Sequence, residues 1–117
     1  MVAKEIALIV GTGPGLSASL TRRFTREGVK VAIAARNIEK LEDLTSKTGA
    51  KAYVCDAVSP AEVKSLFSSV KSDFGEPNIV VYNASSRVRG PITELDPEAV
   101  LNAIKVSCYG AFLVAQQ

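Results

Sequence analysis

The stretch Ile9–Leu20, IVGTGPGLSASL, places three glycines within five residues, Gly11, Gly13 and Gly15, directly after an apolar run. Glycine is costly in a regular element, because it loses more chain entropy on folding than any other residue and buries no side chain. A turn from a strand straight into a helix aims backbone N–H groups and the positive end of the helix dipole at one point. We therefore predict that Gly11 makes a tight turn and that Gly13 and Gly15 leave the backbone open to an anionic ligand.

The rest of the chain alternates between short apolar runs and amphipathic stretches, with glycine or proline between them. Strands separated by helices of this length indicate right-handed crossovers and a parallel sheet. We predict an α/β fold, a Rossmann-type doubly wound parallel sheet with strand order 3-2-1-4, in one domain over residues 1–117. Ligands bind such a sheet at the carboxyl ends of its strands, where the glycine stretch lies. The expected strands are 6–10, 29–35, 52–55 and 79–82, and the expected helices are 16–27, 37–48, 60–74 and 97–117.

Local signals set the ends and faces of these helices. Asn37 and Ser59 stand where capping residues are favoured, and Ser59-Pro60-Ala61-Glu62 reads as a capping box. Leu16, Leu20 and Phe24 recur every four residues, which predicts an apolar face on the first helix. The last helix carries apolar residues that we expect in the core or in a subunit contact, namely Val100, Leu101, Ile104, Val106, Phe112, Leu113 and Val114.

Composition excludes several classes of function. The 117 residues include 14 basic and 12 acidic side chains, for a net charge of +2, so no nucleic-acid partner is expected. Histidine is absent and only Cys55 and Cys108 are present, so no His/Cys metal cluster is expected. No stretch reaches the roughly 20 apolar residues of a membrane span, and the N-terminus shows no cleavage site. We expect a soluble cytoplasmic protein with no membrane partner and no metal.

The glycine stretch resembles that of the short-chain dehydrogenase/reductase family. The pattern of that family, G-x-x-x-G-x-G, falls on Gly11, Gly15 and Ser17, so serine stands at the third glycine. That glycine lets helix and strand pack closely, and we expect the small hydroxymethyl group to cause modest crowding or to add a phosphate contact. The segments 82–85, YNAS, and 110–113, GAFL, resemble the family's N-N-A-G segment and the G-x-F-L of its long interface helix.

The resemblance implies a dinucleotide cofactor bound at the carboxyl ends of the strands. Asp56 resembles the aspartate that receives the adenine amino group after the third strand. Two simpler interpretations stay open: Asp56 could merely start a turn, and Asn83 could satisfy loop backbone without touching a ligand. The residues implied to bind the cofactor are Gly11, Thr12, Gly13, Gly15, Leu16, Arg36, Asp56, Ala57, Asn83, Ala84 and Ser85.

Arg36 decides which dinucleotide is expected. Sheets that bind NAD usually end the second strand with a carboxylate that accepts the ribose hydroxyls. Here the strand ends Ala34-Ala35-Arg36, and a planar guanidinium suits a phosphate. In the family, a basic residue at this point accompanies NADP(H), so NADP(H) is expected and NAD(H) is less favoured. An ordinary solvated arginine is the alternative.

The resemblance implies hydride transfer between the cofactor and a small carbonyl or alcohol substrate, but this chain lacks part of the family's machinery. The Tyr-x-x-x-Lys pair and the substrate-orienting serine are expected beyond Gln117, because none of the three tyrosines is followed by lysine four residues on. Ser107 occupies the position expected for the asparagine of the proton relay. Two alternatives stay open. Ser17, Ser85 and Ser107 favour a non-catalytic dinucleotide-binding or regulatory protein, and a nucleotide-fold methyltransferase also has a glycine loop after its first strand, although the acid that would favour it at the end of the second strand is missing.

The chain's end leads to a further expectation. The last helix is still apolar at Gln117, and the fourth strand would form an unpaired apolar edge of the kind that promotes aggregation. We expect a domain that is incomplete at its C-terminus, that is inactive and not monomeric by itself, and that belongs to a homo-oligomer, dimer or tetramer, when full length.

Overall fold

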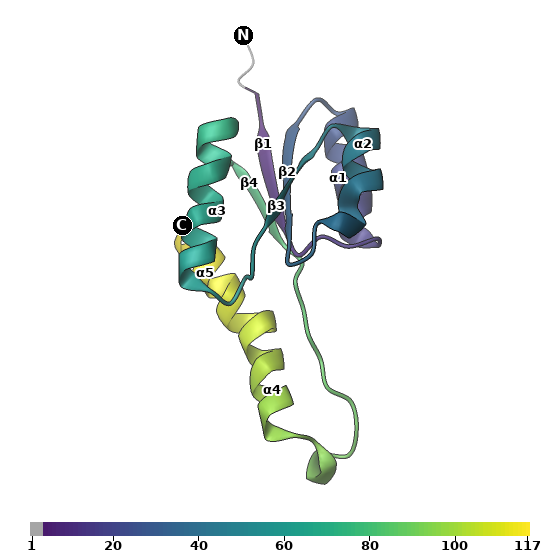
Figure 1. The fold of residues 1–117 in the computed structure, drawn as a ribbon, viewed down its shortest axis with the longest axis vertical. Helices are drawn as coiled ribbons and strands as arrows, with labels where there is room; N and C mark the ends of the chain where they lie inside the picture. The colour runs from purple at the N-terminus through teal and green to yellow at the C-terminus, as the bar shows by residue number, and fades with distance from the viewer. Residues whose placement is uncertain (1–3) are drawn as a thin grey trace.

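In the computed structural model, which describes residues 4–117, four parallel strands form one sheet in the order β3-β2-β1-β4 (Figure 1). This order and the α/β class were predicted and are confirmed. The strands are β1 (Ile6–Val10), β2 (Lys30–Ala35), β3 (Lys51–Val54) and β4 (Ile79–Tyr82). The α-helices are α1 (Leu16–Arg26), α2 (Glu42–Thr48), α3 (Pro60–Asp73), α4 (Pro97–Ile104) and α5 (Gly110–Gln116). Short 3₁₀ turns, η1 (Glu39–Leu41) and η2 (Ile92–Glu94), and a π turn, η3 (Lys105–Tyr109), complete the chain.

The sheet lies between two helical layers, with α1 and α2 on one face and α3 and α5 on the other (Figure 1). Alternate residues of the central strand serve the two faces, as the pleat requires. Leu8 and Val10 join the core under α3 and α5, and Ala7 and Ile9 join the core under α1 and α2. Burial on both faces explains why β1 reads as an unbroken apolar run.

Helix α1 differs from the predicted amphipathic face in its first turn. Leu20 and Phe24 pack against the core as expected, but Leu16 is 63% exposed. The buried face consists of Ser17, Ala18 and Thr21. Leu16 is the first residue of α1, and the small side chains after it allow the start of the helix to lie close to the sheet.

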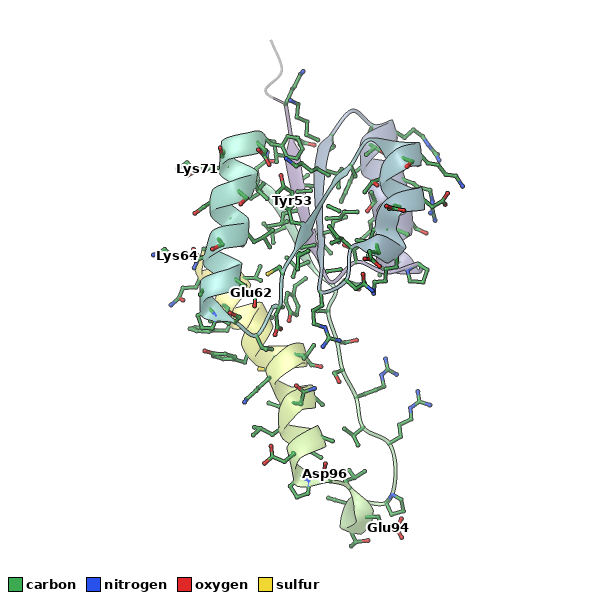
Figure 2. All side chains as sticks on the ribbon, in the orientation of Figure 1. Tyr53, Glu62, Lys64, Lys71, Glu94 and Asp96 are labelled. Atoms are coloured by element: carbon green, nitrogen blue, oxygen red, sulfur yellow. The ribbon has the colours of Figure 1, made fainter. Side chains whose placement is uncertain are left out.

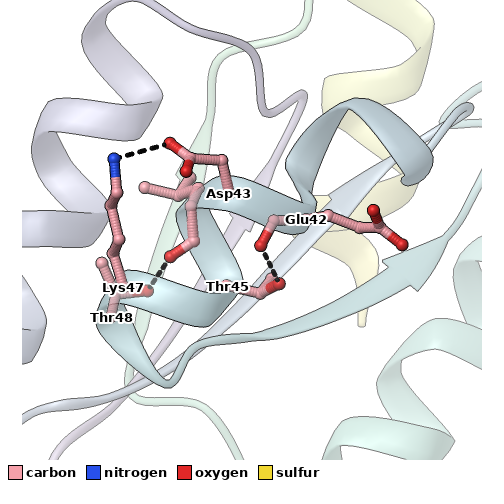
Figure 3. Close-up of polar contacts among 6 residues, drawn as sticks. Glu42, Asp43, Thr45, Lys47 and Thr48 are labelled. Atoms are coloured by element: carbon pink, nitrogen blue, oxygen red, sulfur yellow. Dashed lines mark hydrogen bonds and ion pairs between the residues drawn. The ribbon is translucent and has the colours of Figure 1, made fainter.

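Helix α2 begins later than predicted. The Asn37 carboxamide accepts a hydrogen bond from the Glu39 amide, 3.0 Å, but this starts the 3₁₀ turn η1 and the α-helix begins only at Glu42. Figure 3 shows the contacts of α2, where Lys47 pairs with Asp43 at 3.0 Å. Both side chains are exposed, so this pair adds little stability.

Helix α3 is capped by Ser59 as predicted, because its hydroxyl accepts the Glu62 amide at 3.3 Å. The reciprocal contact predicted for the capping box, between the Glu62 carboxylate and the Ser59 amide, does not form. The Glu62 carboxylate accepts the Asp56 amide instead, at 3.1 Å, and so fastens the turn after β3 to the start of α3. Figure 2 labels Glu62 in the first turn of α3. Asp96 caps α4 in the predicted manner by accepting the Glu98 amide at 3.2 Å.

The predicted last helix is interrupted by the π turn η3, and its apolar residues divide into two groups. Leu113 and Val114 are buried in the core. Leu101, Ile104 and Phe112 are between 46% and 57% exposed within the described chain, so they lie outside its core, and a subunit contact at these residues stays a prediction. The expectation that no stretch has the length and composition of a membrane span is wrong, because Pro97–Gln116 is long and apolar enough by those two criteria. The core helix of a soluble protein meets the same criteria. Figure 1 shows α4 and the loop that follows β4 extending beyond the carboxyl ends of the strands.

Candidate functional site

A cleft of about 530 Å³ lies at the carboxyl ends of the strands. The glycine loop after β1, the segments after β2, β3 and β4, and the helix α4–η3 all contribute to its walls. The structure therefore brings together most of the residues expected to bind a cofactor, while Gly15, Leu16 and Asn83 lie outside the cleft lining. The expected residues that line it are Gly11, Thr12, Gly13, Arg36, Asp56, Ala57, Ala84 and Ser85.

Gly11 makes the predicted tight turn, with φ at +88°. Its amide and that of Thr12 both donate to the Ala34 carbonyl at 3.0 Å, which fixes the turn to β2. A Cβ on Gly11 would also lie 2.5 Å from Ala84 Cα and 2.7 Å from Ala84 Cβ. Gly11 is thus required by a left-handed backbone and by the close approach of the segment after β4.

Gly13 and Gly15 have a different environment. A Cβ built on either would meet no protein atom within 4 Å. Neither glycine adopts a positive φ. Packing within the chain therefore places no steric demand on these two positions, and the backbone at Gly13 lies open in the cleft lining.

Ser17, at the family's third glycine position, neither crowds the loop nor faces the cleft. Its side chain is 1% exposed, and its hydroxyl accepts the Gly13 amide at 2.8 Å and donates to the Gly13 carbonyl at 3.3 Å. The hydroxyl thus ties the glycine loop to the first turn of α1. Sequence reasoning did not anticipate this contact.

Two cations lie at the end of β2. Arg36 and Lys40 both line the cleft, and both side chains are exposed. No ion pair involves either residue within residues 4–117. Lys40 belongs to the 3₁₀ turn η1, which follows β2 in the chain. Lys40 was missed by sequence reasoning, because it reads as an ordinary solvated lysine.

The segment after β3 forms the cleft wall that carries Asp56. The Asp56 carboxylate accepts the Val58 amide at 3.2 Å, so the turn-forming role that had been left open is present, and the same residue lines the cleft. Beside it, Cys55 is 3% exposed. Burial, followed by the charges of Glu62 and Asp56, raises the pKa of the Cys55 thiol to about 11, which makes it a poor nucleophile.

The segment after β4 is held at two points. The Asn83 amide donates to the Val10 carbonyl at 2.8 Å, so its backbone extends the pairing of β4 with β1. Beyond it, the Ser107 hydroxyl accepts the Ser86 amide at 3.1 Å and donates to the Ser86 carbonyl at 3.0 Å. Ser107 therefore acts through Ser86 and is absent from the cleft lining.

Tyr82, the last residue of β4, makes a contact that the sequence did not indicate. Its phenol donates to the Val106 carbonyl in η3, and burial raises the pKa of the phenol. Gly110 makes room for it, because a Cβ there would overlap the phenol oxygen and lie 3.0 Å from the Ala57 carbonyl. The glycine of the GAFL segment thus serves the packing of the sheet against the last helix.

Comparisons with known proteins agree with this fold. A family model described as enoyl-(acyl carrier protein) reductase matches residues 11–117. The chain is 29% identical to a putative ketoacyl reductase of Streptomyces coelicolor, over 97% of this chain and 45% of that protein. Its fold matches an actinorhodin polyketide ketoreductase variant solved with NADPH, with a TM-score of 0.91 and 28% identity over 97% of this chain and 45% of that chain.

A short-chain dehydrogenase/reductase from Serratia marcescens is also similar, with a TM-score of 0.87 and 25% identity over 96% of this chain and 48% of that chain. The chain spans less than half the length of these three proteins. The family model covers nearly all of the chain, and the strand order and the cleft at the strand ends are those expected of the family. The chain therefore belongs to the short-chain dehydrogenase/reductase family of oxidoreductases.

Proposed function

We propose that this chain forms the dinucleotide-binding part of an NADP(H)-dependent reductase of small carbonyl compounds. The observation that carries the proposal is the open backbone at Gly13, which lines the cleft next to a turn that Gly11 fixes in place. No atom of the chain lies within 4 Å of a Cβ built on Gly13, so a ligand accounts best for the glycine there. The polyketide ketoreductase variant with the same fold was solved with NADPH, which supports this ligand.

The residues of the cleft would divide the cofactor between them. The glycine loop would receive the pyrophosphate through backbone amides, and Asp56 would accept the adenine amino group. Arg36, with Lys40 nearby, would hold the 2′-phosphate, because no carboxylate competes at the end of β2. When bound, NADPH supplies a hydride to the substrate carbonyl, and we propose that the proton donor lies outside residues 1–117.

The preference for NADP(H) is tested by titrating NADPH and NADH against the full-length protein and two variants. We expect tighter binding of NADPH and loss of most of that preference in Arg36→Ala, by about 1.5–3 kcal/mol for a charge-assisted contact. Arg26→Ala is the matched control, since Arg26 is an exposed arginine on α1 away from the cleft. Equal affinities of the parent protein for the two nucleotides would refute the assignment.

A non-catalytic dinucleotide-binding protein is the second candidate. The departures from the family pattern at Ser17, Ser85 and Ser107 favour it. The two proposals differ in turnover: a reductase oxidises NADPH when a small ketone is added, whereas a binding protein shows the same NADPH affinity with no consumption. A Tyr-x-x-x-Lys pair in the full-length protein would favour the reductase.

A further inference from the structure

The wall of the cleft formed by the segment after β4 is fastened to the last helix by two side chains. Ser86 and Val106 both line the cleft, one from each element. The Ser107 hydroxyl binds both backbone groups of Ser86, and the Tyr82 phenol binds the backbone carbonyl of Val106. Both contacts therefore end on backbone atoms of residues that shape the cleft.

The π turn explains why the Val106 carbonyl is available. In an α-helix, this carbonyl would accept the amide four residues later, at Gly110. Here the Gly110 amide donates to Lys105 instead, one residue earlier than Val106. The Tyr82 phenol donates to the Val106 carbonyl, which the Gly110 amide does not use, and the missing side chain at Gly110 provides the space for the phenol.

Ser107 supplies hydrogen-bond partners for backbone groups in the segment after β4. The segment after β4 is irregular from Asn83 to Ser86, so the Ser86 amide and carbonyl have no partners in a sheet or helix. The Ser107 hydroxyl serves both, at 3.1 and 3.0 Å. The single proton of the Ser107 hydroxyl and one of its two acceptor lone pairs are thereby used by Ser86.

We propose that Ser107 is a positioning residue that, with Tyr82, holds the cleft wall at Ser86 and Val106 in the shape that receives the dinucleotide. This inference rests on the proposed function for the identity of the ligand. It also assigns a role to a position where the family has an asparagine. In this chain a hydroxyl does the holding, and the residue acts on the cofactor only through the backbone of Ser86.

The test compares Ser107→Ala with Ser107→Thr in the full-length protein, using amide hydrogen exchange at Ser86 and NADPH titration. Removing the hydroxyl should speed exchange at Ser86 about tenfold and weaken NADPH binding several-fold, as expected for ordinary hydrogen bonds. Threonine keeps the hydroxyl and should restore both. Ser65→Ala, an exposed serine on α3, is the matched control and should change neither.

A second variant tests the hydrogen bond between Tyr82 and Val106. Tyr82→Phe keeps the aromatic ring beside Gly110 and removes only the hydroxyl group that donates to the Val106 carbonyl. It should speed exchange of the amides in η3 while leaving that of Ser86 close to the parent's. If the amide exchange rates of η3 in Tyr82→Phe equal those of the parent protein, Tyr82 has no part in holding the cleft wall.

The outcomes separate this inference from the proposed function. Parental exchange at Ser86 in Ser107→Ala, or a threonine variant that fails to restore it, would overturn the role of the hydroxyl. Faster exchange with unchanged NADPH affinity would overturn its role in binding. If the parent protein itself fails to bind NADPH, the proposed function is wrong, and the exchange rates alone decide whether Ser107 holds the wall.

Discussion

Three glycine-to-alanine substitutions separate the steric, conformational and ligand-binding reasons for glycine in this chain. Gly11 has φ at +88° and lies against Ala84, Gly28 has φ at +83° with no atom near a built Cβ, and Gly13 has neither constraint. An L-residue in the left-handed region costs about 1–2 kcal/mol. Forcing a methyl group into a packed contact costs about 1–3 kcal/mol more.

Gly11→Ala should therefore lower the free energy of unfolding by about 2–5 kcal/mol, a large fraction of a typical domain's stability. Gly28→Ala should lower it by only the conformational part, about 1–2 kcal/mol. Gly13→Ala should be neutral or slightly stabilising, since alanine restricts the unfolded chain. Urea unfolding of the three variants and the parent measures these differences directly.

The same variants should rank differently in dinucleotide binding. Gly13→Ala places a methyl group where the proposed pyrophosphate approaches, so we expect at least about a tenfold loss of NADPH affinity, or 1.4 kcal/mol. Gly28→Ala, at the far end of α1, should bind NADPH like the parent. A Gly13→Ala variant with parental affinity would refute the idea that the loop is open for a phosphate, and a stable Gly11→Ala would refute the packing argument.

Three further predictions follow from the same contacts. Hydrogen bonds from Lys51 and Tyr53 lower the pKa of Asp73, so they stabilise the fold above the carboxyl group's ordinary pKa and are lost as the pH falls through its lowered value; below about pH 4 the urea midpoint of the parent should fall more than that of Asp73→Asn. Iodoacetamide at pH 8 should alkylate exposed Cys108 well before Cys55, whose thiol is buried, and equal rates would contradict this. Gly110→Ala should destabilise the protein by about 1–3 kcal/mol in urea unfolding, because its Cβ would overlap the Tyr82 phenol.

The strand order could be predicted because its signals are local. An unbroken apolar run, a glycine turn and an amphipathic stretch repeat along the chain, and the handedness of parallel crossovers then leaves few arrangements. Gly11 was likewise predictable, since a turn directly after a buried strand calls for a left-handed residue. Much of the cleft lining followed, because the carboxyl ends of parallel strands meet at one edge of the sheet.

The contacts that were missed join residues far apart in sequence. Tyr82 and Val106 are 24 residues apart, and Ser86 and Ser107 are 21 apart. No local pattern marks such pairs, and the π turn that makes one of them possible has no signature in the apolar periodicity of the last helix. The exposure of Leu16 was missed for a related reason, since helical periodicity does not reveal that the small residues of α1 face the sheet.

Two of the departures from the family pattern, Ser17 and Ser107, make the same kind of contact. Ser17 binds the amide and the carbonyl of Gly13, and Ser107 binds the amide and the carbonyl of Ser86. In each case a hydroxyl on a helix serves both backbone groups of one residue in the cleft lining. A loop that lost its ligand would have no need for such restraint, because its polar groups could turn to water. The restraint agrees with a cleft that keeps its ligand, which both the reductase and the non-catalytic dinucleotide-binding protein would do. Ser17 and Ser107 therefore do not favour the non-catalytic alternative, which then depends on Ser85.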